Sequence, residues 1–82
     1  MVTIKRIDRQ NDIVTALYYP ENSGENGVVT VDLSAKEIVK SGSTIVPGYS
    51  EIYQYKAGRR LIQYFEDADK DEIPAQLVCV WY

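Results

Sequence analysis

Three aspartates at alternate positions form the cluster in this sequence that comes nearest to metal-ligand spacing. Asp67, Asp69 and Asp71 match the Asp-x-Asp-x-Asp pattern that opens a calcium-binding loop. Such a loop also needs a glycine at its sixth position, where this chain has Glu72. It needs a glutamate at its twelfth position, where this chain has Val78. We therefore predict no metal site, and we expect an acidic loop in contact with solvent over 66–72. A regulator that binds a small molecule or a metal ion with this loop is an alternative function.

A second cluster combines cations with tyrosines. Lys56, Arg59 and Arg60 lie beside Tyr53 and Tyr55, and such a group can neutralise phosphates and stack on bases. The whole chain is acidic, however, with a formal net charge of −3, and three cations are too few to hold a nucleic-acid backbone. We predict no nucleic-acid partner, and we expect the cationic side chains to cover the edge of an apolar helix face with their aliphatic stems.

The catalytic repertoire of the chain is narrow because it has no histidine and a single cysteine. Histidine-based triads and His-Glu-x-x-His zinc sites are therefore excluded. Cys79 lies in an apolar segment with no cation close in sequence, and we expect it to behave as a small hydrophobic residue. We predict a protein that is not an enzyme and that needs no cofactor. A hydrolase that uses two carboxylates is a second alternative, because such chemistry requires no other side chain.

The composition also gives an expectation about the compartment. A lone cysteine forms no internal disulfide, and Lys5 and Arg6 stand where the apolar stretch of a signal peptide would begin. No segment approaches the roughly 18 apolar residues that a membrane-spanning helix needs. We therefore expect a cytoplasmic protein without a membrane partner, and its size and composition are typical of small bacterial proteins.

The elements that must position these side chains are strands in the first half of the chain. Alternating and β-branched residues predict strands over 2–8, 13–19 and 28–33, and a short fourth strand over 37–40. Proline, asparagine and glycine punctuate the segment 20–27, which is typical of a turn. These four strands are expected to form a mostly antiparallel sheet.

Residues 49–68 predict one amphipathic helix. Ser50 can cap its first turn, whereas Gly58 costs about 1 kcal/mol relative to alanine in its interior. A hairpin of 52–55 and 61–65 is the alternative, but its adjacent apolar pairs fit a wide helical stripe better. Eight of the ten residues on the predicted buried face are apolar or aromatic: Tyr49, Ile52, Tyr53, Lys56, Ala57, Arg60, Leu61, Tyr64, Phe65 and Ala68.

The last strand completes the predicted fold. Residues 76–82 are apolar on both faces, so we expect this strand to lie inside the sheet rather than at its edge. The chain, residues 1–82, is then a single small domain of the α+β class with the order β-β-β-β-α-β. It has two layers, a mostly antiparallel four- to five-stranded sheet and one amphipathic helix. One helix covers only one face of such a sheet, so the other face remains bare.

The seven tyrosines and the one tryptophan lead to a prediction of function. Tyrosine and tryptophan are enriched at protein interfaces because they combine a large apolar area with a polar tip. We expect Tyr18, Tyr19 and Tyr55 to lie outside the core and, with Arg59, to form a protein-interaction surface. The sequence therefore predicts a non-enzymatic domain that binds another protein or a second copy of itself through an aromatic-rich surface.

Overall fold

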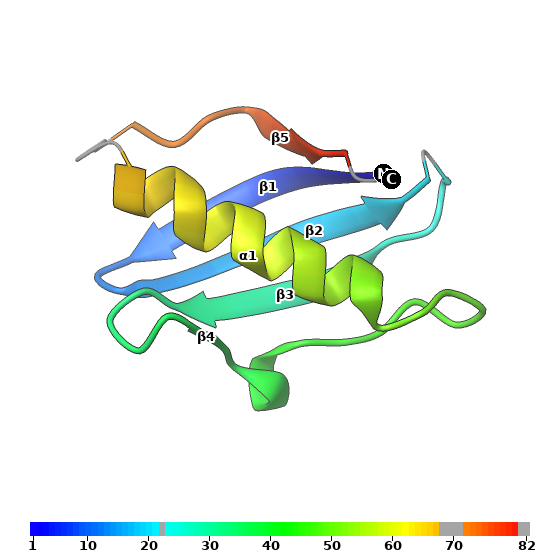
Figure 1. Cartoon of the computed structure of the whole chain (residues 1–82), viewed down its shortest axis with the longest axis horizontal. Helices are drawn as coiled ribbons and strands as arrows, with labels where there is room; N and C mark the ends of the chain where they lie inside the picture. The colour runs from blue at the N-terminus through cyan, green and yellow to red at the C-terminus, as the bar shows by residue number, and fades with distance from the viewer. Residues whose placement is uncertain (22, 68–71, 81–82) are drawn as a thin grey trace.

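The chain folds into a five-stranded antiparallel sheet and one α-helix that lies across one face of the sheet (Figure 1). The structure is a computed structural model, and it describes residues 1–21, 23–67 and 72–80. Four strands precede the helix along the chain and one strand follows it. The predicted α+β class, the antiparallel sheet and the order of the elements are therefore confirmed.

The first three strands pair with their neighbours in the chain. They are β1 (Val2–Gln10), β2 (Ile13–Pro20) and β3 (Gly27–Asp32). Because successive side chains of a strand point to opposite faces, Val14 and Tyr18 of β2 both turn toward the core. The prediction that Tyr18 lies outside the core is wrong: only 1% of this residue is exposed.

An irregularity in β1 keeps apolar residues of both its halves in the core. The pairing register with β2 shifts between Lys5 and Asp8, and Arg6 has a positive φ of 52°. This extra residue is a β-bulge, which changes the face to which the following side chains point. As a result, Ile4 before the bulge and Ile7 after it are both buried.

Different strands form the two edges of the sheet. β4 (Glu37–Ile38) pairs with the end of β3, and β5 (Gln76–Cys79) pairs with β1, so the order is β4-β3-β2-β1-β5. The prediction that the last strand lies inside the sheet is wrong. The apolar residues on its outer face are not buried by a second layer, since Val78 is 41% exposed.

The helix α1 (Ile52–Asp67) replaces the alternative of a hairpin in this segment. The Ser50 side chain accepts a hydrogen bond from the Ile52 backbone N–H over 3.2 Å, so it caps the first turn as predicted. The buried face is rotated from the predicted one, because Ile52 is 43% exposed. The helix residues that are buried are Gln54, Ala57, Gly58, Leu61, Ile62 and Phe65.

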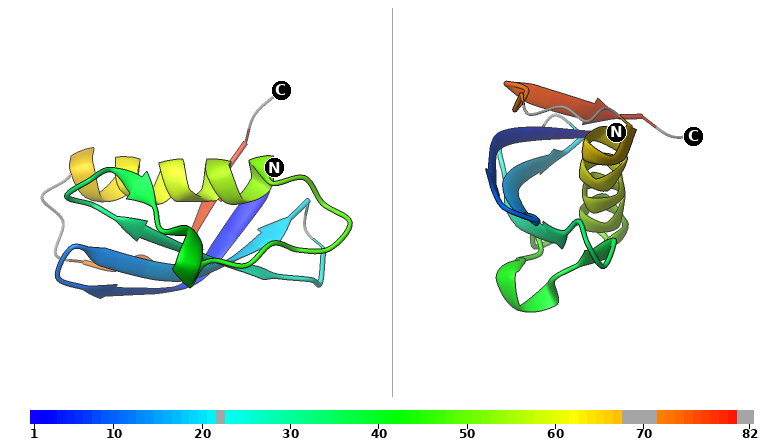
Figure 2. Two further views of the ribbon diagram at one scale, coloured as in Figure 1. Left: turned by 90° about the horizontal axis from the view of Figure 1, so that it is seen from below. Right: turned by 90° about the vertical axis from the view of Figure 1, so that its left-hand side faces the viewer.

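Gly58 allows α1 to approach the sheet closely. A Cβ atom at this position would lie 2.6 Å from Cγ1 of Ile38 and 3.3 Å from Cγ1 of Val31. The glycine that weakens the isolated helix therefore has a packing role against β3 and β4. Viewed along its length, the helix lies inside the curve of the sheet, with β5 on one side and β3 and β4 on the other (Figure 2).

A buried polar contact fixes the segment between β4 and α1. The Tyr18 hydroxyl and the Gln54 side-chain amide each donate a hydrogen bond to the Thr44 carbonyl oxygen, both over 3.1 Å. Two donors on one carbonyl satisfy the polar atoms that the core would otherwise leave unpaired. Burial raises the pKa of the Tyr18 phenol above its ordinary value of 10.0.

Candidate protein-interaction surface

The four side chains predicted to form an interaction surface lie in three different places. Tyr18 is in the core, whereas Tyr19 is half-buried on the face of the sheet that the helix leaves bare. Tyr55 and Arg59 are exposed on α1, where they line an open hollow together with Ile38 of β4. The structure thus brings Tyr55 and Arg59 together but does not gather the four predicted residues into one surface.

The three candidate metal ligands are largely beyond the described part of the chain. Asp69 and Asp71 lie outside the described residues, and Asp67 is the last residue of α1, with no description of its side chain. Among the residues that are described, no three histidine, cysteine, aspartate or glutamate side chains lie close enough together to hold a metal ion. Cation binding by the acidic 66–72 segment stays a prediction.

The bare face of the sheet mixes apolar and polar side chains. Leu17 pairs with Val28 across β2 and β3, and Tyr19 pairs with Thr3 of β1. The Lys5 ammonium group lies 5.5 Å from the centre of the Tyr19 ring, a cation–π arrangement. Because the sheet curves around the helix, this outer face is convex (Figure 2).

The β3 side of the sheet is closed by the chain itself. Beyond the two residues of β4, the Val39 N–H donates to the Thr30 carbonyl over 2.8 Å. Further along, the Thr44 N–H donates to the Val28 carbonyl over 2.9 Å, and the Thr44 hydroxyl accepts from the Val28 N–H over 3.0 Å. The backbone groups along this side of β3 are therefore occupied by β4 and the segment 39–44, and the strand left at this border is only the two residues of β4, one of which is charged.

The β5 side of the sheet is open. Within the described residues, β5 pairs only with β1, so alternate backbone groups of β5 point away from the sheet. Proteins usually protect an edge strand with charged side chains, a proline or a bulge. Residues 75–80 contain neither a charge nor a proline, and Val78 and Val80 are 41% and 55% exposed. We call this uncharged border, residues 76–80, the β5 edge.

A basic hollow lies beside the β5 edge, on the side of the helix. It is open, has a volume of roughly 460 Å³ and is lined by Lys56, Arg59, Arg60, Gln63, Glu66 and Cys79. Three of these side chains are cations and one is an anion. The Glu66 carboxylate also lies 3.5 Å from the Lys36 ammonium group, which balances part of its charge. Counted over its described lining residues, the hollow is therefore net positive in an acidic protein.

Cys79 connects this basic hollow to the β5 edge. It pairs with Val2, which is fully buried in the core, so the Cys79 side chain is on the helix side of the sheet. Cys79 is partly buried and is a free thiol. If another strand paired with the outer side of β5, its side chains on the helix side of the sheet would therefore enter the hollow beside Lys56 and Arg60.

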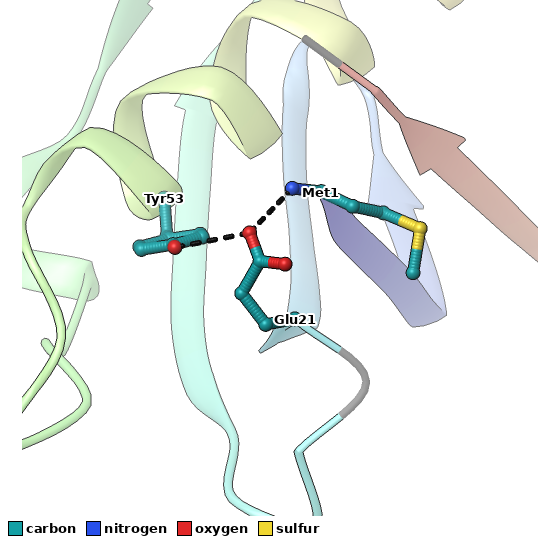
Figure 3. Close-up of polar contacts among 3 residues, drawn as sticks. All are labelled: Met1, Glu21 and Tyr53. Atoms are coloured by element: carbon teal, nitrogen blue, oxygen red, sulfur yellow. Dashed lines mark hydrogen bonds and ion pairs between the residues drawn. The ribbon is translucent and has the colours of Figure 1, made fainter. Parts of the chain in front are cut away.

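The strand that supports the β5 edge is itself held by a polar cluster (Figure 3). The Glu21 carboxylate accepts a hydrogen bond from the Met1 amino group over 2.7 Å and another from the Tyr53 hydroxyl over 3.0 Å. These two donors hold the pKa of Glu21 below its ordinary value of 4.5. The cluster joins the start of β1, the end of β2 and the first turn of α1, and so positions the part of β1 that pairs with Cys79.

The sequence analysis did not predict the β5 edge. It identified the cations of the basic hollow but expected them to cover the edge of an apolar helix face. The signal for the edge was the lack of any charge between Ala75 and Val80, but the sequence does not show which side of a strand is unpaired.

In the residues that the structure describes, no helix is both long enough and apolar enough to cross a membrane. Comparison of the chain with protein-family models, with curated protein sequences and with solved structures finds no match.

Proposed function

We propose that this chain is a non-enzymatic protein-interaction domain that binds an extended segment of a partner protein as an added strand along the β5 edge. The observation that carries the proposal is the contrast between the two borders of the sheet: one ends in β4, a strand of two residues that includes a glutamate, and the other ends in β5, a strand of four uncharged residues. Addition of a peptide strand to an exposed sheet edge is a common mode of recognition.

The length of the β5 edge sets the affinity to expect. A partner strand can pair with about four or five residues, and each backbone hydrogen bond contributes a net stabilisation of about 1 kcal/mol. The exposed side chains of Val78 and Val80 add apolar contacts. After the entropic cost of ordering a peptide, these contributions correspond to weak binding, in the millimolar range.

Titration of the ¹⁵N-labelled chain with a short peptide that alternates glutamine and valine tests this proposal by NMR. We expect the amide signals of residues 76–80 to shift and those of the bare face, such as Leu17, to stay in place. Val80→Lys should weaken the binding, because a charged side chain on an edge strand opposes strand pairing. Ile13→Lys, a matched change at an exposed apolar site of β2, should not. If no strand-forming peptide shifts β5 at millimolar concentration, the proposal is wrong.

A further inference from the structure

We propose that the segment bound along the β5 edge is acidic, with carboxylates at alternate positions on the side that faces α1. This inference rests on the proposed function, because it describes the partner of that same edge. It follows from the juxtaposition of an uncharged edge strand with a basic hollow, two features that come from β5 and α1 respectively.

The alternation of side chains in a strand decides which residues of the partner enter the hollow. A partner strand next to β5 places every second side chain on the helix side, and these side chains are about 7 Å apart. The hollow begins at Cys79, which is the helix-side residue of β5 there. Lys56 and Arg60 are four helix positions apart, a rise of about 6 Å along α1. Two alternate carboxylates of the partner can therefore each reach a different cation.

The summed charge of the side chains that line the hollow favours anions, and this holds even where a cation also contacts a residue of the chain. Among the described residues, the lining of the hollow carries three positive charges and one negative charge, and the Lys36 ammonium group is close to the negative one. An exposed ion pair changes an affinity by about two- to fivefold, so two pairs give roughly tenfold. Because the hollow is open to solvent, this preference should decrease as salt screens the charges.

A second copy of this chain fits the hollow less well than an acidic partner. Two β5 strands could pair edge to edge, but residues 75–80 contain no carboxylate to place beside Lys56 and Arg60. Such a dimer would bring two basic hollows close to the same interface. The β5 edge also offers backbone N–H and C=O groups at the spacing of a β-strand. A peptide strand can pair with these groups, whereas a nucleic acid has no backbone that matches them. An extended acidic peptide satisfies both features at once.

The test uses three short peptides of equal length, in which valine alternates with glutamate, glutamine or lysine. Their affinities for the full chain are measured by NMR titration at low and high salt. We expect the glutamate peptide to bind roughly tenfold more tightly than the glutamine peptide, and the lysine peptide to bind most weakly. The difference should shrink at high salt, and the shifted amide signals should be those of residues 76–80.

A matched pair of double variants locates the preference. Lys56→Gln with Arg60→Gln should reduce the roughly tenfold preference for glutamate over glutamine to about twofold or less. Arg6→Gln with Lys40→Gln removes the same charge from sites that neither line the hollow nor pair with β5, and should leave the preference nearly intact. Amide spectra of both double variants, recorded without peptide, should show the same folded structure as the parent chain.

Four outcomes would overturn the inference, and one of them separates it from the proposed function. Equal binding of the glutamate and glutamine peptides at β5 would remove the acidic preference and leave strand addition intact. Binding of no peptide would remove both. A preference lost equally in the two double variants would show only general electrostatic attraction. Sedimentation that shows a dimer of the parent chain, abolished by Val80→Lys, would make a second copy the occupant of the β5 edge.

Discussion

Replacement of Gly58 by alanine sets a local gain in helix stability against a packing clash. Alanine is favoured over glycine in a helix interior by about 1 kcal/mol. Its Cβ atom, however, would lie 2.6 Å from Cγ1 and 2.7 Å from Cδ1 of Ile38, whereas carbon atoms prefer about 3.5–4.0 Å. Either α1 moves away from β4 by about 1 Å, or the Ile38 side chain leaves its preferred rotamer. Such overpacking costs about 2–3 kcal/mol, so we expect a net loss of about 1–2 kcal/mol in the free energy of unfolding.

A double-mutant cycle measured by urea unfolding checks this reasoning. Ile38→Ala removes the two closest atoms and leaves only the 3.3 Å approach to Cγ1 of Val31, so Gly58→Ala in that background should instead stabilise the chain, by at most about 1 kcal/mol. The coupling between the two sites should then be about 1–3 kcal/mol. Gln63→Ala, at an exposed position of the same helix, should change stability by less than about 0.5 kcal/mol. If Gly58→Ala alone stabilises the chain, α1 does not pack against β4 as described.

Substitutions at three further sites test the polar contacts of the fold. Tyr18→Phe removes one of two donors to the Thr44 carbonyl and should cost about 1 kcal/mol in urea unfolding, since the Gln54 amide still donates to that carbonyl. The pKa of Glu21 is lowered in the folded state, so its stabilising effect is present above pH 4.5 and is lost as the pH falls through the folded-state pKa. Glu21→Gln should therefore flatten the decrease in the free energy of unfolding at acid pH. An unchanged pH profile would show that Glu21 does not accept the hydrogen bonds of the Met1 and Tyr53 cluster. The Asp32 carboxylate accepts hydrogen bonds from the turn that follows β3, and these bonds lower its pKa. Asp32→Ala should destabilise the chain at neutral pH and Asp32→Asn less so, whereas equal effects of the two would show that the acceptor oxygen is not what matters.

Local patterns were enough to predict most of the elements. The alternation in β2 and the wide apolar stripe of 49–68 each depend on neighbouring residues, and both elements form where they were expected. The patterns were less able to predict which face of each element is buried. Tyr18 and Tyr19 are adjacent, and the side of the strand that reaches the core is decided by packing against α1. Gln54 was not assigned to the core because a buried amide depends on a distant acceptor, which is the Thr44 carbonyl.

The candidate site could not be predicted because its parts are far apart in the sequence. The β5 edge exists only because β5 pairs with β1, the strand at the other end of the chain. The basic hollow needs Cys79 of β5 and Arg60 of α1 in the same place, and no spacing rule connects these residues. Charge counting identified the cations, but only the three-dimensional arrangement places them beside an open strand.

Amide hydrogen exchange along β5 tests most directly the claim that this strand is an open edge. In the free chain, amides that point toward β1 should exchange slowly, and alternate amides that point outward should exchange fast. Addition of the peptide that alternates glutamate and valine should slow the fast amides of residues 76–80. Uniform protection of β5 in the free chain at low protein concentration, or fast amides that stay fast in saturating peptide, would contradict it.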